Sequence, residues 1–306
     1  MEHNFVRQNV LPVIAALIWG TTFVAQSVAA EHMGAFTFNA ARSVIAVVFL
    51  AGLCLVRRHF RGSAVDSWKE LIKAGTCSGT ALAVATWLQQ TGMATTQPGK
   101  AGFITALYIV IVPVIGLFLK RKAPPMIWVS VALAAVGLYL LSVTERLTIE
   151  PGDVYMILCA VCFSFQILII DHFSRRVDGV AMSCVQFCVM TCISTLGAVV
   201  MSEPVSADAF RLCAASILFA GIFSSGIAYT LQILAQKDSN PTVVSLLLSL
   251  ESVFAALSGA LFRHERMTAR ELCGCALMFV AVVIAQLPQS AAASGFMRRR
   301  HAKNRG

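Results

Sequence analysis

The sequence alternates between long apolar blocks and short polar connections, and this alternation limits the chain to few folds. The blocks are rich in leucine, alanine, valine and isoleucine. They run for about 18–22 residues, long enough as helices to cross a hydrocarbon core of ~30 Å. Only 13% of the 306 residues are charged, whereas soluble domains carry about a quarter. We therefore predict an all-α, polytopic membrane protein.

Turn residues and charges divide the chain into ten expected transmembrane helices. The first apolar block is long for a signal-peptide core and is followed by further spans, so we interpret it as a helix rather than a cleaved leader. The expected helices cover residues 10–29, 35–56, 70–91, 99–119, 125–143, 153–171, 180–201, 210–235, 241–262 and 270–288.

The positions of the basic residues predict an orientation. With ten crossings, most of the 24 lysines and arginines fall on the side of the N-terminus. Cytoplasmic loops are enriched in these residues, so we expect a bacterial plasma-membrane protein with both termini in the cytoplasm. The connection RHERMTARE runs against this bias. We expect the basic tail, 289–306, to lie against anionic lipid and not to bind nucleic acid.

The second half of the chain repeats the first. Gln89 and Gln232 lie 143 positions apart, as do Pro98 and Pro241, in the matching stretches LQQTGMATTQP and LQILAQKDSNP. Each half has five expected helices, an odd number, so the second half must enter the membrane from the opposite side. We therefore expect two inverted-topology repeats, 10–146 and 151–288. By exchanging their shapes, such repeats can open a central site to either side of the membrane in turn.

Several further stretches carry a family resemblance: AALIWGTTFVAQ, FNAARS, GFITALYIVIVP and SLLLSLESVFAALSGALFRHER, together with the repeated Gln and Pro positions. With them the chain resembles the EamA-type members of the drug/metabolite transporter (DMT) superfamily over nearly its whole length. The family often has a Gly-Glu pair where this chain has His264-Glu265, and the first-half counterpart KRKAPP lacks the glutamate. The resemblance implies a ten-helix inverted repeat that exports amino acids, metabolites or drugs. It also implies a cavity away from helices 125–143 and 270–288.

Glu251 and Arg42 lie well inside expected helices, where charge is costly and marks a functional site by default. Asp153 and Asp171 are weaker candidates because they lie at helix ends, where water can reach them. Glu251 follows Pro241 by about ten residues, which places it ~15 Å deep at a rise of ~1.5 Å per residue. Three interpretations of Glu251 remain open. It can line a transport cavity and titrate, coupling protons to the solute. It can be a fixed partner of Arg42, or it can stay protonated and hydrogen-bond a neighbouring helix.

Uncharged polar and aromatic residues recur in the same helices. A binding cavity needs apolar walls and a few polar groups directed into it. Such mixtures occur in the expected helices 10–29, 70–91, 99–119, 153–171, 210–235 and 241–262. A single glutamine is as readily explained by an interhelical hydrogen bond, and a single tryptophan by packing, so only the set as a whole predicts a cavity. The candidate substrate or coupling residues are Glu251, Arg42, Gln26, Gln89, Gln166, Gln232, Trp19, Trp87, Tyr108 and Tyr229.

We interpret the chain as a secondary active transporter, an exporter of a small organic solute that is amino acid-like or a drug. It has no GxxxxGK[ST] motif for ATP, and we expect no cofactor and no metal. The ten cysteines lie mostly in apolar segments and fit helix packing. Two alternatives stay open: an intramembrane lipid-modifying enzyme, for which clustered catalytic groups are missing, and a passive facilitator or channel.

Overall fold

A computed structural model describes residues 6–61, 67–96, 98–120, 124–142, 151–237, 239–262 and 268–286, and these segments contain helices and no strands. The basic tail 289–306 and the pair His264-Glu265 lie outside the described residues. Within the described part, seven helical stretches are long and apolar enough to cross a membrane, and Pro125–Leu140 is a shorter apolar helix. The chain is therefore an integral, multi-pass membrane protein, as the apolar blocks predict.

The helices lie close to the ranges expected from the sequence. The first half contains η1 (Val6–Val10), α2 (Leu11–Ala30), α3 (Ala35–Arg61), α4 (Trp68–Gly92), α5 (Pro98–Thr105), α6 (Tyr108–Phe118) and α7 (Pro125–Ser142). The second half contains α8 (Pro151–Phe173), α9 (Gly179–Val200), α10 (Ala207–Leu212), α11 (Ala214–Phe219), η2 (Ala220–Ala228), α12 (Tyr229–Gln236), α13 (Pro241–Leu248), α14 (Leu250–Phe262) and α15 (Ala269–Gln286).

Capping residues and prolines fix where several helices begin. The side chains of Ser67, Asp178 and Asn240 accept hydrogen bonds from backbone N–H groups in the first turns of α4, α9 and α13. These N–H groups have no partner within their helix, so each cap satisfies a donor that would otherwise be unpaired. Proline stands at the start of α5, α7, α8 and α13, where its missing N–H costs nothing.

Three expected helices are interrupted, which the sequence did not predict. The range 99–119 divides into α5 and α6, and the range 241–262 divides into α13 and α14. The two breaks correspond, since Thr105 and Leu248, the last residues before them, lie 143 positions apart. The range 210–235 divides too, because it contains the π-helical segment η2 between α11 and α12.

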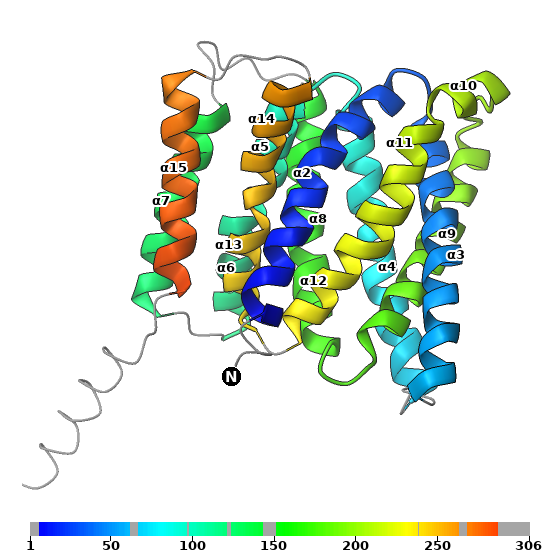
Figure 1. Ribbon diagram of the computed structural model, residues 1–306, viewed down its shortest axis with the longest axis horizontal. Helices are drawn as coiled ribbons and strands as arrows, with labels where there is room; N and C mark the ends of the chain where they lie inside the picture. Colours follow the sequence, from blue (N-terminus) through cyan, green and yellow to red (C-terminus); the bar gives the residue numbers. More distant parts are fainter. Residues whose placement is uncertain are drawn as a thin grey trace, which may run out of the picture.

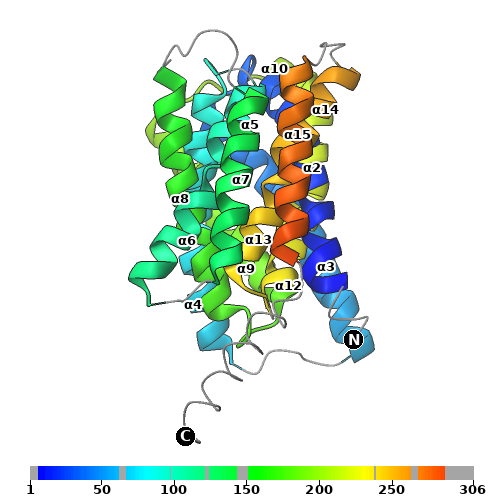
Figure 2. The ribbon, with the colours of Figure 1, turned by 90° about the vertical axis from the view of Figure 1, so that its left-hand side faces the viewer.

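The helices form two layers, which Figures 1 and 2 show from two directions. In Figure 1 the near layer contains α15, α13 with α14, α2, α11 to α12, and α3. The layer behind contains α7, α5 with α6, α8, α4 and α9. Each layer takes helices from both halves of the chain. The two halves are therefore interleaved and do not form separate bundles.

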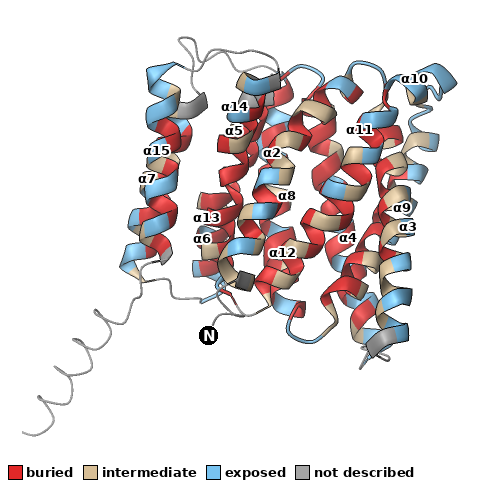
Figure 3. Ribbon diagram, in the orientation of Figure 1, coloured by how far each residue is buried: buried red, intermediate tan, exposed pale blue. Residues whose placement is uncertain are grey.

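The outer faces are apolar, unlike the surface of a soluble protein, and the interior contains buried polar groups among its apolar core. Large apolar side chains such as Val48, Leu55 and Val199 are about 70% exposed on the outer faces, while glutamines and charged residues are buried in the middle. The window of Pro241–Ser258 is 72% buried and that of Ala35–His59 only 28%, and Figure 3 shows the buried residues gathered on the central helices. Apolar surface of this extent has to be covered, and lipid covers it in a membrane.

Polar contacts fasten α3 to α9 at both ends. Arg57 donates from Nη1 and Nη2 to the two carboxylate oxygens of Asp178, each over 3.0 Å. At the other end, the carboxylate of Glu203 accepts from the backbone N–H groups of Phe36 and Thr37 and from the Thr37 hydroxyl. Negative charge at a helix N-terminus is favourable, so Glu203 stabilises the start of α3.

Candidate functional site

A cavity of about 30 Å³ lies between the two layers. That is room for about two water molecules, since a cavity needs roughly 10–15 Å³ of such volume to hold one. Its walls come from α2, α3, α4, α5, α6, α8, η2, α12, α13 and α14, and neither α7 nor α15 contributes a residue. The lining residues are Trp19, Thr22, Phe23, Gln26, Arg42, Gln89, Thr105, Tyr108, Phe163, Gln166, Ile167, Ser224, Tyr229, Gln232, Leu248 and Glu251.

The two broken helices meet at this cavity through a single hydrogen bond. The hydroxyl of Tyr108 donates to Glu251 Oε1 over 3.0 Å, and the two residues lie 143 positions apart. Tyr108 is the first residue of α6, and Glu251 is the second residue of α14. Matching positions of the two halves are therefore in direct contact. The carboxyl also lies at a helix N-terminus, where the helix dipole favours negative charge.

A glycine brings α2 close to this carboxyl. A Cβ atom on Gly20 would lie 2.5 Å from Phe254 Cβ and 2.7 Å from the backbone oxygen of Glu251. Such distances are far inside van der Waals contact, so only glycine allows α2 to pack this tightly against α14. The contact holds Trp19, the preceding residue, and Glu251 at one cavity.

The glutamines form two corresponding pairs. Gln26 Nε2 donates to Gln89 Oε1 over 3.0 Å, and Gln232 Nε2 donates to Gln166 Oε1 over 3.2 Å. In the first half the pair joins α2 to α4, and in the second half it joins α8 to α12. Neighbouring glutamines extend both pairs, since Gln90 Nε2 donates to the Gln26 carbonyl and Gln236 Nε2 to the Ile167 carbonyl.

Arg42 reaches the cavity from α3 without an ion-pair partner among the described residues. Its side chain is buried, and its Nε and Nη2 atoms make no hydrogen bond. The Phe38 ring lies 5.5 Å from the guanidinium carbon, a distance that allows a cation–π contact. Glu251 is hydrogen-bonded to Tyr108, and the structure shows no ion pair between Arg42 and Glu251.

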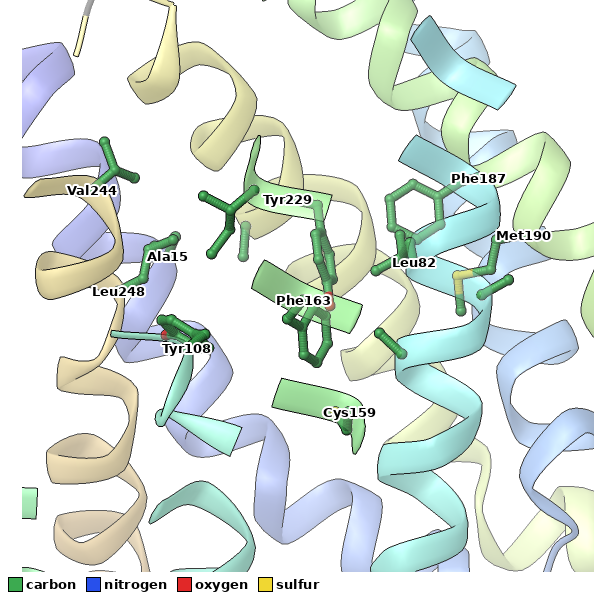
Figure 4. Packing of buried hydrophobic residues seen from close by; sticks show 14 of the residues in the cluster. Ala15, Leu82, Tyr108, Cys159, Phe163, Phe187, Met190, Tyr229, Val244 and Leu248 are labelled. Carbon is green, nitrogen blue, oxygen red and sulfur yellow. The ribbon is translucent and has the colours of Figure 1, made fainter. Parts of the chain in front are cut away.

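Aromatic rings supply much of the apolar wall. The Trp19 and Tyr229 rings lie 4.7 Å apart, and Tyr229 also contacts Phe187 edge-on at 5.6 Å. Figure 4 shows Tyr108, Phe163 and Tyr229 in one cluster of buried side chains with Leu248. The cavity thus combines apolar walls with a few polar groups, the composition typical of a small-molecule site.

The structure brings nine of the ten candidate residues together and leaves one outside. Trp87 does not line the cavity; its ring stacks on Phe36 at 5.2 Å, so packing is its role. Seven other lining residues were not among the candidates: Thr22, Phe23, Thr105, Phe163, Ile167, Ser224 and Leu248. Thr105 and Leu248 precede Tyr108 and Glu251 by three residues, so the helical period offered a signal for both.

The described residues contain no group of three or more His, Cys, Asp or Glu side chains placed to hold a metal ion. The ten cysteines are free thiols, and Cys159, Cys213 and Cys275 are buried.

Comparison with known proteins gives the same family over both halves of the chain. The family model described as the EamA-like transporter family matches residues 8–143 and again residues 150–286. A solved crystal structure superposes with a TM-score of 0.74 over 92% of this chain and 96% of that chain, at 18% sequence identity. At this identity the likeness shows the fold alone.

Two relatives come from Archaeoglobus fulgidus, and both are named "Uncharacterized transporter". One is 30% identical over 276 residues, covering 90% of this chain and 84% of the relative. The other is 24% identical over 282 residues, covering 91% of this chain and 97% of the relative. The match of the family model to both halves and these relatives place the chain in the EamA-like transporter family, and with it in the drug/metabolite transporter superfamily.

Proposed function

We propose that the protein is a secondary active exporter of a small organic metabolite, amino acid-like or a drug, that works by alternating access. The proposal includes ten transmembrane helices in two inverted repeats, 10–146 and 151–288. It also includes a plasma-membrane location with both termini in the cytoplasm. The separate matches of one family model to the two halves support the repeat.

The hydrogen bond between Tyr108 and Glu251 carries the proposal. It joins matching residues of the two halves where both broken helices reach the cavity. In secondary transporters with inverted repeats, the substrate site lies near the bilayer midplane and is formed by discontinuous helices. A contact between equivalent residues lies on the axis that relates the halves, so the two halves can move about it as a pair.

The small cavity supports movement of the halves. Sites for organic ligands usually enclose about 300–1,000 Å³, whereas this cavity has about 30 Å³. In the proposed cycle, the layers separate at one end to admit a solute that is larger than this cavity. Glu251 is the proposed coupling group, because it is the buried carboxyl that lines the cavity.

A binding screen followed by a flux assay tests the proposal. Purified protein is screened by thermal shift against amino acids, organic acids, amines and drugs at acid and alkaline pH, since a ligand of the folded state raises its stability. Solutes that bind are then followed in proteoliposomes with and without a pH gradient. We expect the gradient to drive accumulation by the wild type.

The matched variants are Glu251→Gln, which keeps the shape of the side chain, and Asp208→Asn, which changes an acid on α10 that is 85% exposed. We expect the first to bind and move solute without a response to the pH gradient, and the second to behave as the wild type. Unchanged pH dependence in Glu251→Gln would contradict the coupling role. Absence of solute flux in the wild type under every gradient would contradict the transport function.

A further inference from the structure

Arg42 is a buried cation for which the described part of the chain provides no anion. Its side chain is 2% exposed, and Nε and Nη2 have no hydrogen-bond partner. The carboxylates that could serve are engaged: Glu251 accepts from Tyr108, Asp178 binds Arg57 and Asp153 binds Lys100. A buried charge without a partner is strongly unfavourable, so the residue has to be explained by something that binds there.

The unpaired atoms of Arg42 have a definite geometry. Nε–H and Nη2–H lie on one edge of the planar guanidinium and point in parallel, so this fork can donate one hydrogen bond to each oxygen of a carboxylate. Arg57 shows the same kind of recognition completed within the chain, with its Nη1 and Nη2 bound to the two oxygens of Asp178. Arg42 lines the cavity, and the Nε and Nη2 atoms of its fork have no hydrogen-bond partner.

Other unpaired groups of the lining residues also favour a ligand rich in acceptors. Trp19 Nε1 and Gln166 Nε2 are buried donors without partners, and Gln232 Oε1 is a buried acceptor without one. With the two Arg42 atoms, unpaired donors outnumber unpaired acceptors at this cavity. A cationic or purely apolar solute would leave these donors unsatisfied, at a cost that a bound anion avoids.

We propose that Arg42 binds the carboxylate of the transported solute, so that the substrate class is a small organic acid or a zwitterion with a free carboxylate. This inference rests on the proposed transport function and specifies its substrate. The aromatic wall of Trp19, Tyr229 and Phe163 contacts the rest of the solute, and the Tyr108–Glu251 side accepts any donor group it carries. The carboxylate oxygens accept hydrogen bonds from Nε–H and Nη2–H of Arg42, and no covalent step is involved.

The repeat supplies a variant that should still fold. Gln186 stands in α9 at the position that matches Arg42, 144 residues later, and is itself fully buried. Its backbone oxygen lies beside Gly79 of α4, just as the backbone oxygen of Arg42 lies beside Gly221 of η2. Arg42→Gln therefore gives position 42 the same residue type that occupies the matching position 186 in the second half. Because Arg42 makes no ion pair among the described residues, its replacement by glutamine breaks none. We therefore expect the ligand-free variant to melt at the same temperature as the wild type or higher.

The test uses matched acids and amides on the purified protein and in proteoliposomes. The probes are acetate with acetamide, butyrate with butyramide and phenylacetate with phenylacetamide, with phenethylamine as the cation. Binding is read from thermal shift and from the tryptophan fluorescence of the protein in a chloride-free buffer, and flux is read from counterflow. We expect acids to bind and amides of the same shape not to. Arg42→Gln should weaken acid binding about 10- to 100-fold, the loss of hydrogen bonds to a charged group.

Arg42→Lys and Gln186→Met complete the set. Lysine keeps the charge without the planar fork, so it should retain part of the affinity, while Gln186→Met should leave acid binding unchanged.

A lower melting temperature of ligand-free Arg42→Gln with unchanged acid binding would show a structural role and overturn the inference. Wild-type protein that carries phenethylamine or the amides and ignores the acids, or that requires chloride instead, would overturn it while the transport function stands. A protein that binds and moves no solute would overturn both.

Discussion

At the scale of single residues, the central contact of this protein joins two residues 143 positions apart, which are equivalent in the proposed repeat. Tyr108 and Glu251 begin the second parts of matching broken helices, and their side chains differ as donor and acceptor. Two tyrosines or two glutamates at this point would lack this complementarity, and two carboxylates would repel. If the two halves are repeats as proposed, their difference at this position allows the hydrogen bond between the two broken helices.

A double-mutant cycle measures this bond. Tyr108→Phe removes the donor and leaves the Glu251 carboxyl buried without it, so we expect a loss of about 1–3 kcal/mol in the free energy of unfolding. Glu251→Gln keeps an acceptor oxygen and should cost less. The change in the free energy of unfolding caused by Glu251→Gln should therefore differ between the Tyr108→Phe background and the wild type. Thermal unfolding in detergent provides the four values.

Tyr155→Phe is the control, because Tyr155 lies on α8 with 38% of its surface exposed, and it should leave stability unchanged. Strict additivity of the two central substitutions would argue against a direct bond between Tyr108 and Glu251.

At the scale of helices, glycines decide which elements touch. Gly20 lets α2 lie against α14, and Gly75 and Gly79 let α4 lie against Val185 and Gln186 of α9. The four-residue spacing of the last two predicts such a contact from sequence. These contacts bring helices of opposite halves together, so the small residues hold the interleaved arrangement as well as the cavity.

A pair of alanine substitutions tests this point. Gly20→Ala puts a Cβ atom 2.5 Å from Phe254 Cβ, so α2 and α14 must separate, at a cost of about 1–3 kcal/mol for overpacking. Gly52→Ala in α3 is the matched control, because nothing lies within 4 Å of the added atom, and helix propensity predicts no loss. We expect Gly20→Ala to melt lower and Gly52→Ala to melt at the wild-type temperature or higher. Equal melting temperatures would mean that the contact between α2 and α14 relaxes without cost.

At the scale of the whole molecule, one ion pair joins the two layers at one end, and another joins two helices of the same layer at the opposite end. Arg57 joins α3 to Asp178 at the end where η1 begins, and Lys100 of α5 binds Asp153 of α8 over 2.6 Å at the opposite end (Figure 1). The pair α7 and α15 stands at one edge of both layers, away from the cavity. Movements that open the site can therefore leave this pair, and the α3–α9 pair, intact.

The proposed orientation can be checked with reporter fusions. A fluorescent protein matures in the cytoplasm, and alkaline phosphatase is active only after export. With both termini in the cytoplasm, fusions ending at Val177 or Lys237 should fluoresce, and a fusion ending at Ser202 should give phosphatase activity. The reverse pattern would invert the orientation, and identical signals from Val177 and Ser202 would contradict the crossing of the membrane by α9.

Much of the fold follows from the sequence alone, because the bilayer is a demanding solvent. Backbone groups in hydrocarbon must be hydrogen-bonded internally, so apolar blocks of this length had to be helices, and proline and capping residues fixed many of their ends. The offset of 143 positions is visible in Gln89 and Gln232. The same offset separates Tyr108 from Glu251, but only the structure drew attention to that pair. Nine of the ten candidate residues line one cavity, since polar groups avoid lipid and gather inside.

The tertiary structure decided the rest, because it depends on contacts between residues far apart in the chain. No local signal interrupts α5–α6 or α13–α14, where the partner helix supplies the contact at the break. Trp87 has the composition of a cavity residue but packs on Phe36, since its direction depends on how α4 turns against α3. The sequence placed Arg42 and Glu251 inside the membrane and left their pairing open. Only the packing showed that Glu251 binds Tyr108 and that the guanidinium of Arg42 has no hydrogen-bond partner at Nε or Nη2.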